Sequence, residues 1–216
     1  MAINLILIGP PGAGKGTQAK ILEQEYHIVQ ISTGDMLRAR LSKGDDFAQE
    51  IKTIMASGGY VTDDIMIKML DERISEDDCK NGFILDGFPR TVPQAEALDT
   101  MLAEKGKKLK AIIELKVDEE ALVERITGRF SCAKCGASYH KKFNPTKVEN
   151  ICDTCGGTEF ICRTDDNEDT FRTRLKTFND QTAPILPYYK NKGLLQQVDG
   201  MEDVAHVAAA IKEIVG

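Results

Sequence analysis

A glycine-rich loop containing one lysine follows the first apolar run of the chain. It reads Gly9-Pro10-Pro11-Gly12-Ala13-Gly14-Lys15-Gly16-Thr17 and precedes a segment with helical periodicity. In such a loop backbone N–H groups turn toward phosphate oxygens, the helix N-terminus adds its dipole, and the lysine supplies a point charge. Thr17 offers a hydroxyl to Mg²⁺, although the general pattern has Ser or Thr directly after the lysine. A turn that merely begins a helix is the alternative, but strand, loop, lysine and helix together favour phosphate binding.

Two CxxC pairs form a second group of chemically capable residues. Cys132 and Cys135 are separated by sixteen residues from Cys152 and Cys155, and a glycine follows each pair. This spacing is typical of a tetrahedral zinc site, with iron or four free thiols as the alternatives. Four protein ligands leave no open coordination position, so the metal is expected to be structural. His140 is expected to lie outside the ligand set.

An aspartate and two polar residues follow a third apolar run. Asp86 ends this run, where a carboxylate can hold Mg²⁺ directly or through water, or can simply begin a turn. Arg90 can fork onto phosphate oxygens near the same strand end. The Gln94 amide offers an adjacent donor and acceptor that can match the edge of adenine, or it can be a solvated helix residue. Arg38, near Thr33, is equally open to a phosphate role and to a plain surface role.

Short apolar runs alternate along the chain with longer amphipathic segments. Strands are predicted at 5–8, 28–31, 83–85, 111–115 and 194–198, and helices at 15–26, 62–74, 91–104 and 119–126. Asp63, Asp64, Asp118 and Glu119 mark helix starts. This alternation predicts an α/β fold with a five-stranded parallel sheet covered by helices on both faces. Active sites in such sheets lie at the carboxyl ends of the strands, where the motifs fall.

The segment 128–166 interrupts the alternation, because it carries the paired cysteines and turn residues without a long apolar run. It is predicted to be an insertion. Asp165 and Asp166, at its end, are open to two interpretations, pairing with arginine or a plain charged hinge.

Composition limits the function classes that the motifs allow. The chain has 216 residues, 42% hydrophobic and 29% charged, with a net charge of −6. An acidic protein lacks the field needed for broad nucleic-acid or anionic-membrane surfaces. The N-terminal run lacks a basic region and is broken by Asn4, and no stretch approaches the roughly 18 apolar residues of a membrane span. A cytoplasmic location is therefore expected, where six cysteines are read as metal ligands before disulfides.

Several spaced motifs together resemble the adenylate kinase family. They are Gly14-Lys15-Gly16-Thr17, Ser32-Thr33-Gly34-Asp35-Met36-Leu37-Arg38 and Asp86-Gly87-Phe88-Pro89-Arg90. In that family's loop a glycine stands between the lysine and the threonine. Gly16 therefore departs from the general phosphate-loop pattern but matches the form found in this family. The resemblance runs from Ile3 nearly to the end of the chain, and the lid resembles the long, metal-bearing form. It implies a P-loop core at 1–31, 62–127 and 167–216, an AMP-binding segment at 32–61 and a zinc-binding lid at 128–166.

The resemblance also implies residue roles. Residues expected to contact ATP are Gly12, Ala13, Gly14, Lys15, Gly16, Thr17, Arg125, Arg129, Ser138, Tyr139 and Glu202. Residues expected to contact AMP are Thr33, Arg38, Gly59, Tyr60, Val61, Gly87, Phe88, Pro89, Arg90, Gln94, Arg163 and Arg174. The implied catalytic residues are Lys15, Arg90, Arg129, Arg163 and Arg174. Arg125 would stack on the ATP base, and Glu202 would touch it through backbone atoms.

The implied reaction is Mg²⁺-dependent phosphoryl transfer from ATP to AMP, giving two ADP, in a monomer that holds one structural Zn²⁺. None of the three histidines stands beside a candidate nucleophile in a recognised spacing. An AMP phosphate is already anionic, so positioning and charge neutralisation suffice. A switch GTPase should carry an Asn-Lys-x-Asp motif that reads its base. This chain does not support that class, because its Asn191-Lys192 pair is followed by Gly193-Leu194. A zinc-ribbon nucleic-acid binder conflicts with the acidic charge, whereas another nucleoside monophosphate kinase remains the closest alternative.

Overall fold

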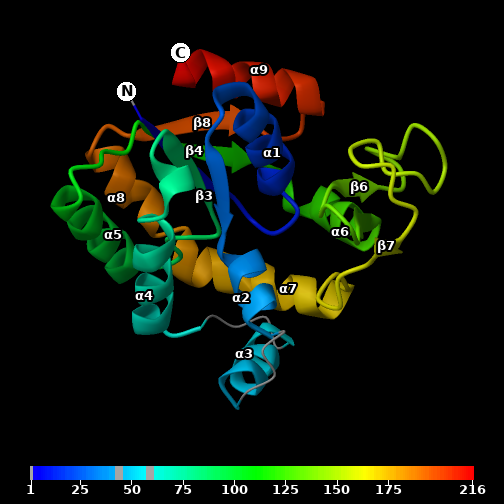
Figure 1. Ribbon diagram of the computed structural model, residues 1–216, viewed down its shortest axis with the longest axis horizontal. Helices are drawn as coiled ribbons and strands as arrows, with labels where there is room; N and C mark the ends of the chain where they lie inside the picture. The colour runs from blue at the N-terminus through cyan, green and yellow to red at the C-terminus, as the bar shows by residue number, and fades with distance from the viewer. Residues whose placement is uncertain (1, 42–45, 57–60) are drawn as a thin grey trace.

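A five-stranded parallel sheet forms the centre of the computed structural model, which describes residues 2–41, 46–56 and 61–216 (Figure 1). Its strands lie in the order β2-β3-β1-β4-β8. They are β1 (Ile3–Ile8), β2 (Val29–Ser32), β3 (Gly82–Asp86), β4 (Ala111–Lys116) and β8 (Leu195–Asp199). All four pairings are parallel. The predicted α/β fold and its five strands are confirmed, with ends shifted by one or two residues.

The register of the sheet brings the predicted motifs to one edge. Asp86 at the end of β3 pairs with Leu7 of β1 and with Ser32 of β2, and Ile8 pairs with Glu114 of β4. The chain therefore leaves β1, β2 and β3 at the same level, into the glycine-rich loop, the Thr33 segment and the Gly87 segment. This edge is the carboxyl end of the sheet, where α/β proteins place their ligands.

Helices cover both faces of this sheet (Figure 1). The four predicted helices are present as α1 (Lys15–Tyr26), α4 (Asp63–Arg73), α5 (Val92–Glu104) and α6 (Glu119–Thr127). The structure adds α2 (Thr33–Leu41), α3 (Asp46–Ala56), α7 (Glu168–Thr177), α8 (Ile185–Asn191) and α9 (Val204–Val215), a 3₁₀ turn at Asp77–Cys79 and a π-helical turn at Phe178–Thr182.

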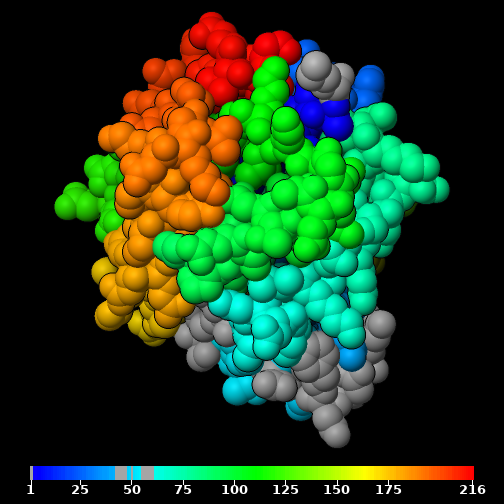
Figure 2. Space-filling model, turned by 90° about the vertical axis from the view of Figure 1, so that its left-hand side faces the viewer, coloured from blue at the N-terminus to red at the C-terminus, as the bar shows by residue number. Residues whose placement is uncertain are grey.

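Alternation along the strands divides the core into two layers. Ile6 and Leu85 face a cluster that includes residues of α4, α5 and α8, whereas Leu5 and Ile84 face residues of α1 and α9. Figure 2 shows the first of these sides, with α8 in orange beside α5 in green. The three inner strands β1, β3 and β4 are largely buried and read as nearly continuous apolar runs, whereas the edge strands β2 and β8 are only partly buried.

A second, smaller sheet lies within the segment that interrupts the alternation. Its antiparallel strands β5 (Arg129–Cys132), β6 (Ser138–His140) and β7 (Phe160–Ile161) lie in the order β6-β5-β7. Its own core contains Tyr139 packed against Phe130 and Phe160. In Figure 1 this unit projects to the right of α6, away from the central sheet. Among the described residues, no helix has the length and apolar character needed to span a membrane.

Candidate active site and metal centre

The glycine-rich loop has a backbone conformation that favours glycine at two positions. Gly12 and Gly14 have φ values of +83° and +92°, in the left-handed region that favours glycine. A Cβ on Gly12 would lie 3.0 Å from Ile126 Cγ1, so the loop also packs closely on α6. Lys15 Nζ donates hydrogen bonds to the carbonyl oxygens of Gly9 at 2.7 Å and Pro10 at 2.9 Å. The Lys15 ammonium is therefore held against the first residues of the glycine-rich loop, where phosphate binding is predicted.

Cations from three other segments converge on Lys15. Burial lowers the pKa of the Lys15 ammonium to about 8; Asp86 acts in the opposite direction, while Arg174, Arg90 and Arg129 lower the pKa further. These guanidinium groups come from α7, the segment after β3 and strand β5. Four cations thus gather beside the glycine-rich loop, an arrangement that favours binding of a multiply charged anion.

Side-chain hydrogen bonds connect the carboxyl end of β3 with that of β2. The Gln30 side-chain amide donates to Asp86 Oδ2 at 3.1 Å, and Thr33 Oγ1 donates to the Gly87 carbonyl at 2.9 Å. Arg90 Nε donates to the same carbonyl at 2.7 Å. A Cβ on Gly87 would lie 2.8 Å from Thr33 Oγ1, so glycine is needed for this close approach. The structure thus brings together Thr33, Gly87 and Arg90, which the family resemblance assigns to AMP.

The Phe88–Pro89 peptide bond is cis, and the chain then turns into α5. Gln94 lies in the first turn of this helix, and its side chain is only 1% exposed. Its Oε1 accepts from the Arg90 backbone N–H at 2.7 Å, while its Nε2 donates to Asp63 Oδ1 at 2.6 Å. The amide is therefore a fixed, buried group, and not the solvated side chain of the alternative interpretation.

Two adjacent aspartates hold two of the arginines. Arg129 Nε donates to Asp166 Oδ2 at 2.7 Å, and a second guanidinium nitrogen bonds the other carboxylate oxygen. The Asp166 side chain is 3% exposed, so this bidentate pair is largely shielded from water. Arg174 donates to Asp165 at 2.7 Å. Both aspartates thus pair with arginine in this structure, while a dependence of these pairs on lid closure stays a prediction.

A third aspartate connects the segment after β2 with the segment before α7. Asp35 Oδ1 accepts from Arg38 Nη2 at 2.5 Å and lies 3.7 Å from Arg163 Nη2. Burial raises the pKa of the Asp35 carboxyl, but the hydrogen bond and charge of Arg38, followed by the charge of Arg163, outweigh it and leave the pKa below its usual value. Asp35 is therefore an anion shared by two arginines that the sequence assigned to AMP.

The remaining residues that the resemblance assigns to ATP lie outside the glycine-rich loop. Arg125 donates to the Gly200 carbonyl at 2.8 Å, and its guanidinium lies 6.0 Å from the Phe143 ring centroid. Tyr139 is buried in the small sheet's core, and its hydroxyl accepts from the Asp153 backbone N–H at 2.8 Å. The structure does not direct the Tyr139 ring toward the glycine-rich loop. A contact of this residue with ATP stays a prediction, as does one of its neighbour Ser138.

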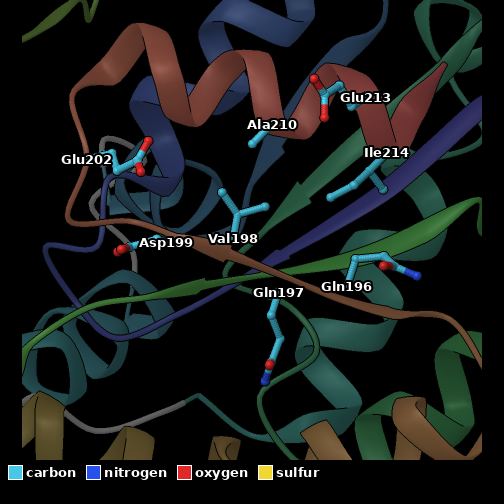
Figure 3. A pocket seen from close by; sticks show the side chains of 8 residues that line it. All are labelled: Gln196, Gln197, Val198, Asp199, Glu202, Ala210, Glu213 and Ile214. Atoms are coloured by element: carbon cyan, nitrogen blue, oxygen red, sulfur yellow. The ribbon is translucent and has the colours of Figure 1, made fainter.

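Glu202 lies in the loop that joins β8 to α9. It lines a groove of about 600 Å³ between β8 and α9, with Asp199 at the same end and Glu213 at the opposite end (Figure 3). No residue of the glycine-rich loop lines this groove. Two residues after Glu202, the Val204 carbonyl accepts from the Gln18 amide of α1 at 3.0 Å. This bond places the C-terminal loop against the helix that carries Lys15.

The four predicted metal-binding sulfurs are gathered at one point. The sulfurs of Cys132, Cys135, Cys152 and Cys155 all lie within 4.8 Å of one another. Cys132 and Cys155 are 3.6 Å apart, and Cys135 and Cys152 are 3.5 Å apart. Two sulfurs bound at about 2.3 Å to a tetrahedral ion lie about 3.8 Å apart. The cluster therefore fits a tetrahedral zinc ion.

The surroundings of the sulfurs agree with this fit. The Tyr139 hydroxyl, followed by backbone hydrogen bonds of Cys155 and Thr154, lowers the pKa of the Cys152 thiol, whereas burial and the neighbouring cysteines raise the pKa of Cys135. The cluster therefore favours at least one thiolate, the form that binds metal. A Cβ on Gly157 would lie 3.2 Å from Cys132 Sγ, so a larger residue would crowd the cluster. His140 is not available as a ligand. Its Nδ1 accepts from the backbone N–H groups of Lys142 and Phe143, and its Nε2 donates to the Glu124 carbonyl.

Comparison with known proteins agrees with this geometry. The family model described as adenylate kinase matches residues 7–194. The chain is 55% identical to the adenylate kinase of Paramagnetospirillum magneticum over 98% of both chains. It is 51% identical to that of Zymomonas mobilis over 98% of this chain and 95% of the relative, and 49% identical to that of Magnetococcus marinus over 99% and 100%. The chain belongs to the adenylate kinase family.

Membership of the adenylate kinase family confirms the resemblance seen in the sequence. Gly59 and Tyr60, which that resemblance assigns to AMP, lie outside the described residues, whereas Val61 is described and buried. Sequence reasoning missed Gln30 and Asp35 as members of the site, and treated Asp63 only as a helix start. No local signal marks Gln30, because its partner Asp86 is 56 residues away. Asp35 lay inside a quoted motif, and an Asp-x-x-Arg spacing on a helix could have suggested its pairing with Arg38.

Proposed function

We propose that the chain is an adenylate kinase enzyme that catalyses reversible, Mg²⁺-dependent phosphoryl transfer from ATP to AMP, giving two ADP. The observation that carries the proposal is the convergence of Lys15 with Arg90, Arg129 and Arg174 beside a phosphate-binding loop. Phosphoryl transfer needs two phosphate-bearing ligands and a concentration of positive charge between them. In cells this activity would balance the adenine nucleotides and salvage AMP.

The arrangement supports a mechanism without a general base. An oxygen of the AMP phosphate attacks the γ-phosphorus of ATP, a new P–O bond forms, and the bond to the β-phosphate oxygen breaks to leave ADP. The attacking oxygen carries no proton that must be removed. The loop backbone from Gly12 to Thr17 and the Lys15 ammonium would hold the ATP phosphates, while the arginines neutralise charge on the transferred group.

The two ligand sites would be built from different segments. Thr33, Arg38 and Arg90 would hold AMP, together with other residues assigned to it: Gly59, Tyr60, Val61, Gly87, Phe88, Pro89, Gln94, Arg163 and Arg174. Arg125 and the loop near Glu202 would border the ATP base, with Ser138 and Tyr139 contributing from the lid. Asp165 and Asp166 support this proposal, because they hold two of the arginines in fixed positions. Fixed donors need not reorganise as charge develops in the reaction.

Two metals would serve different purposes. Asp86 and Thr17 would hold Mg²⁺, directly or through water, and the ion would supply charge neutralisation at the ATP phosphates. The Gln30 bond to Asp86 supports this role, because it leaves the other carboxylate oxygen with its full acceptor capacity. A structural Zn²⁺ would be held by the four cysteines, and its closed ligand set keeps it out of the chemistry.

The proposed division of the chain follows these sites. A core at 1–31, 62–127 and 167–216 would carry the phosphate loop, 32–61 would bind AMP, and 128–166 would form the zinc-stapled lid. The lid would exclude water as a competing acceptor. We also propose that the protein works in the cytoplasm as a monomer, without nucleic-acid or membrane partners, in keeping with its net charge of −6.

An acceptor panel tests the proposal. Purified protein is mixed with Mg-ATP and with AMP, GMP, CMP or UMP in turn, and the ADP formed is measured against a reaction without acceptor. AMP is expected to give the highest kcat/KM by a wide margin. Equal use of all four acceptors would contradict the proposal. A preference for another nucleotide would indicate a different nucleoside monophosphate kinase.

A further inference from the structure

The buried amide of Gln94 has its orientation set by two partners of opposite character. The Arg90 backbone N–H can only donate, so it requires the amide oxygen, and the Asp63 carboxylate accepts from the amide nitrogen. Reversing the amide would set N–H against N–H and leave the carboxylate facing an oxygen. Because Gln94 is almost fully buried, such a mismatch is not relieved by water. The fold therefore permits one amide orientation.

This orientation has a consequence for base recognition. After these two bonds, Oε1 retains one lone pair and Nε2 retains one hydrogen. Adenine presents a donor at its 6-amino group and an acceptor at N1, which match that pair. Hypoxanthine and guanine present an oxygen at position 6 and a hydrogen at N1, which oppose it. An amide that could reverse would serve either kind of base, but a fixed amide serves only adenine.

We propose that Asp63 is a specificity-determining positioning residue, which fixes the Gln94 amide for an adenine-type acceptor without itself touching the nucleotide. The inference rests on the proposed function, because it takes Gln94 as a reader of the AMP base. Asp63 suits this role by its position at the start of α4. Its second carboxylate oxygen lies 3.4 Å from Oγ1 of Thr91, the N-cap residue of α5. The carboxylate thus joins the starts of two helices around the amide.

The test compares AMP with inosine monophosphate, which differs in the polarity of the edge that Gln94 would read. In Asp63→Ala the amide loses its acceptor. We expect the KM for AMP to rise and the AMP-to-IMP ratio of kcat/KM to fall by about tenfold, with the KM for ATP unchanged. Asp63→Asn keeps a carbonyl oxygen that can accept, so it should retain most of the wild-type ratio.

Asp64→Ala is the matched control, because Asp64 lies beside Asp63 in the first turn of α4 and shares its effect on the helix dipole. It should leave the ratio unchanged. Asp63→Ser is made in parallel, because serine is favourable at a helix start but its side chain is too short to reach Gln94. Thermal unfolding is recorded for each variant. Serine should lower the ratio as alanine does.

The outcomes separate the inference from the function it rests on. If the wild type prefers AMP over IMP and folded Asp63→Ala or Asp63→Ser loses activity equally on both, Asp63 is only structural and the inference is wrong. If the wild type shows no preference for AMP over IMP, base reading by Gln94 fails together with the inference. A lowered ratio that Asp63→Asn restores supports it.

Discussion

Lys15 is surrounded by guanidinium groups and bonded to two carbonyl oxygens, and this placement determines its response to pH. Its pKa of about 8 in the free protein means that the ammonium is lost as pH rises through about 8. If Lys15 must be charged to bind the ATP phosphates, kcat/KM for ATP falls above pH 8. A pH profile from 6 to 10 measures this limb. A flat profile across that range would exclude the role.

The lowered pKa of Lys15 makes stability rise with pH, whereas it makes the predicted activity fall. The pKa of Lys15 is lowered from 10.5 to about 8 on folding, so between these values the unfolded chain binds a proton that the folded chain lacks. This group therefore makes the free energy of unfolding rise with pH over that window. Lys15→Met should remove this part of the slope in denaturant titrations. Lys20→Met, at a half-exposed lysine paired with Glu23, should retain it.

Residue types and spacing predicted the glycine-rich loop and the cysteine cluster, but not the polar side chains that hydrogen-bond to candidate site residues. The glycine-rich loop and the CxxC pairs are local patterns with a fixed physical reason, so one sequence suffices to find them. Gln30 and Asp63 are single polar residues whose partners lie 56 and 31 positions away. Nothing in their neighbourhood distinguishes them from a strand residue or a helix start. Only the folded register of the sheet and the crossing of α4 with α5 bring these pairs together.

At the scale of elements, β3 depends on a glycine at its first residue. Gly82 has φ +125°, and a Cβ there would lie 2.1 Å from the carbonyl oxygen of Ile3, its partner on β1. Gly82→Ala should therefore destabilise the protein by about 3 kcal/mol or more, because backbone has to move. Gly106→Ala is the control: φ is +63° but the space is open, so a cost of about 1–2 kcal/mol is expected. Denaturant unfolding distinguishes the two, and equal losses would contradict the steric argument.

The small sheet has little apolar burial of its own, so the proposed zinc ion is expected to contribute much of its stability. The described part of its core holds Tyr139, Phe130 and Phe160 around the cysteines, and β7 has only two residues. Cys135→Ala should reduce bound zinc from about one per chain to near zero and lower the thermal unfolding temperature. Metal analysis of the purified protein measures this. Cys162→Ala removes an exposed thiol outside the cluster and should retain the metal. Full zinc in Cys135→Ala would refute the four-cysteine assignment.

Most elements of the central sheet and its helices were predicted, although the periodic helix α9 was missed, and the strands of the small sheet were not predicted. The inner strands β1, β3 and β4 were predictable because they are short apolar runs buried in the core, and the helix at 15–26 because it follows the glycine-rich loop with helical periodicity. Strands β5, β6 and β7 lack that signal, since metal ligands and turns replace periodic apolar residues. For Tyr139, the resemblance to the adenylate kinase family implied a contact with ATP. The Tyr139 ring packs against Phe130 and Phe160 in the core of the small sheet, and the contact with ATP stays a prediction.

At the scale of the whole molecule, the small sheet is joined to the rest through charged pairs. Arg129 begins β5, and Asp166 precedes α7, so their bidentate pair connects the two ends of the cysteine-bearing segment. Arg163 extends this network to Asp35 of α2, 3.7 Å away. Three segments that lie far apart in sequence thus share one network of arginines and aspartates. Because the same arginines are proposed to bind phosphates, closure of the lid and binding of nucleotide would depend on the same groups.

The Arg129–Asp166 pair gives the sharpest prediction at this scale. Asp166→Asn leaves a largely buried guanidinium with a neutral partner, which should cost about 3 kcal/mol of unfolding free energy. The exposed pair of Glu168 and Arg172, two residues further on, offers the matched control. Glu168→Gln should change stability by less than about 1 kcal/mol, because solvent screens that pair. Asp166→Asn should also lower kcat for ADP formation, since Arg129 would no longer be held at the phosphates. A variant with wild-type stability and kcat would show that the two ends of the lid are joined by other contacts.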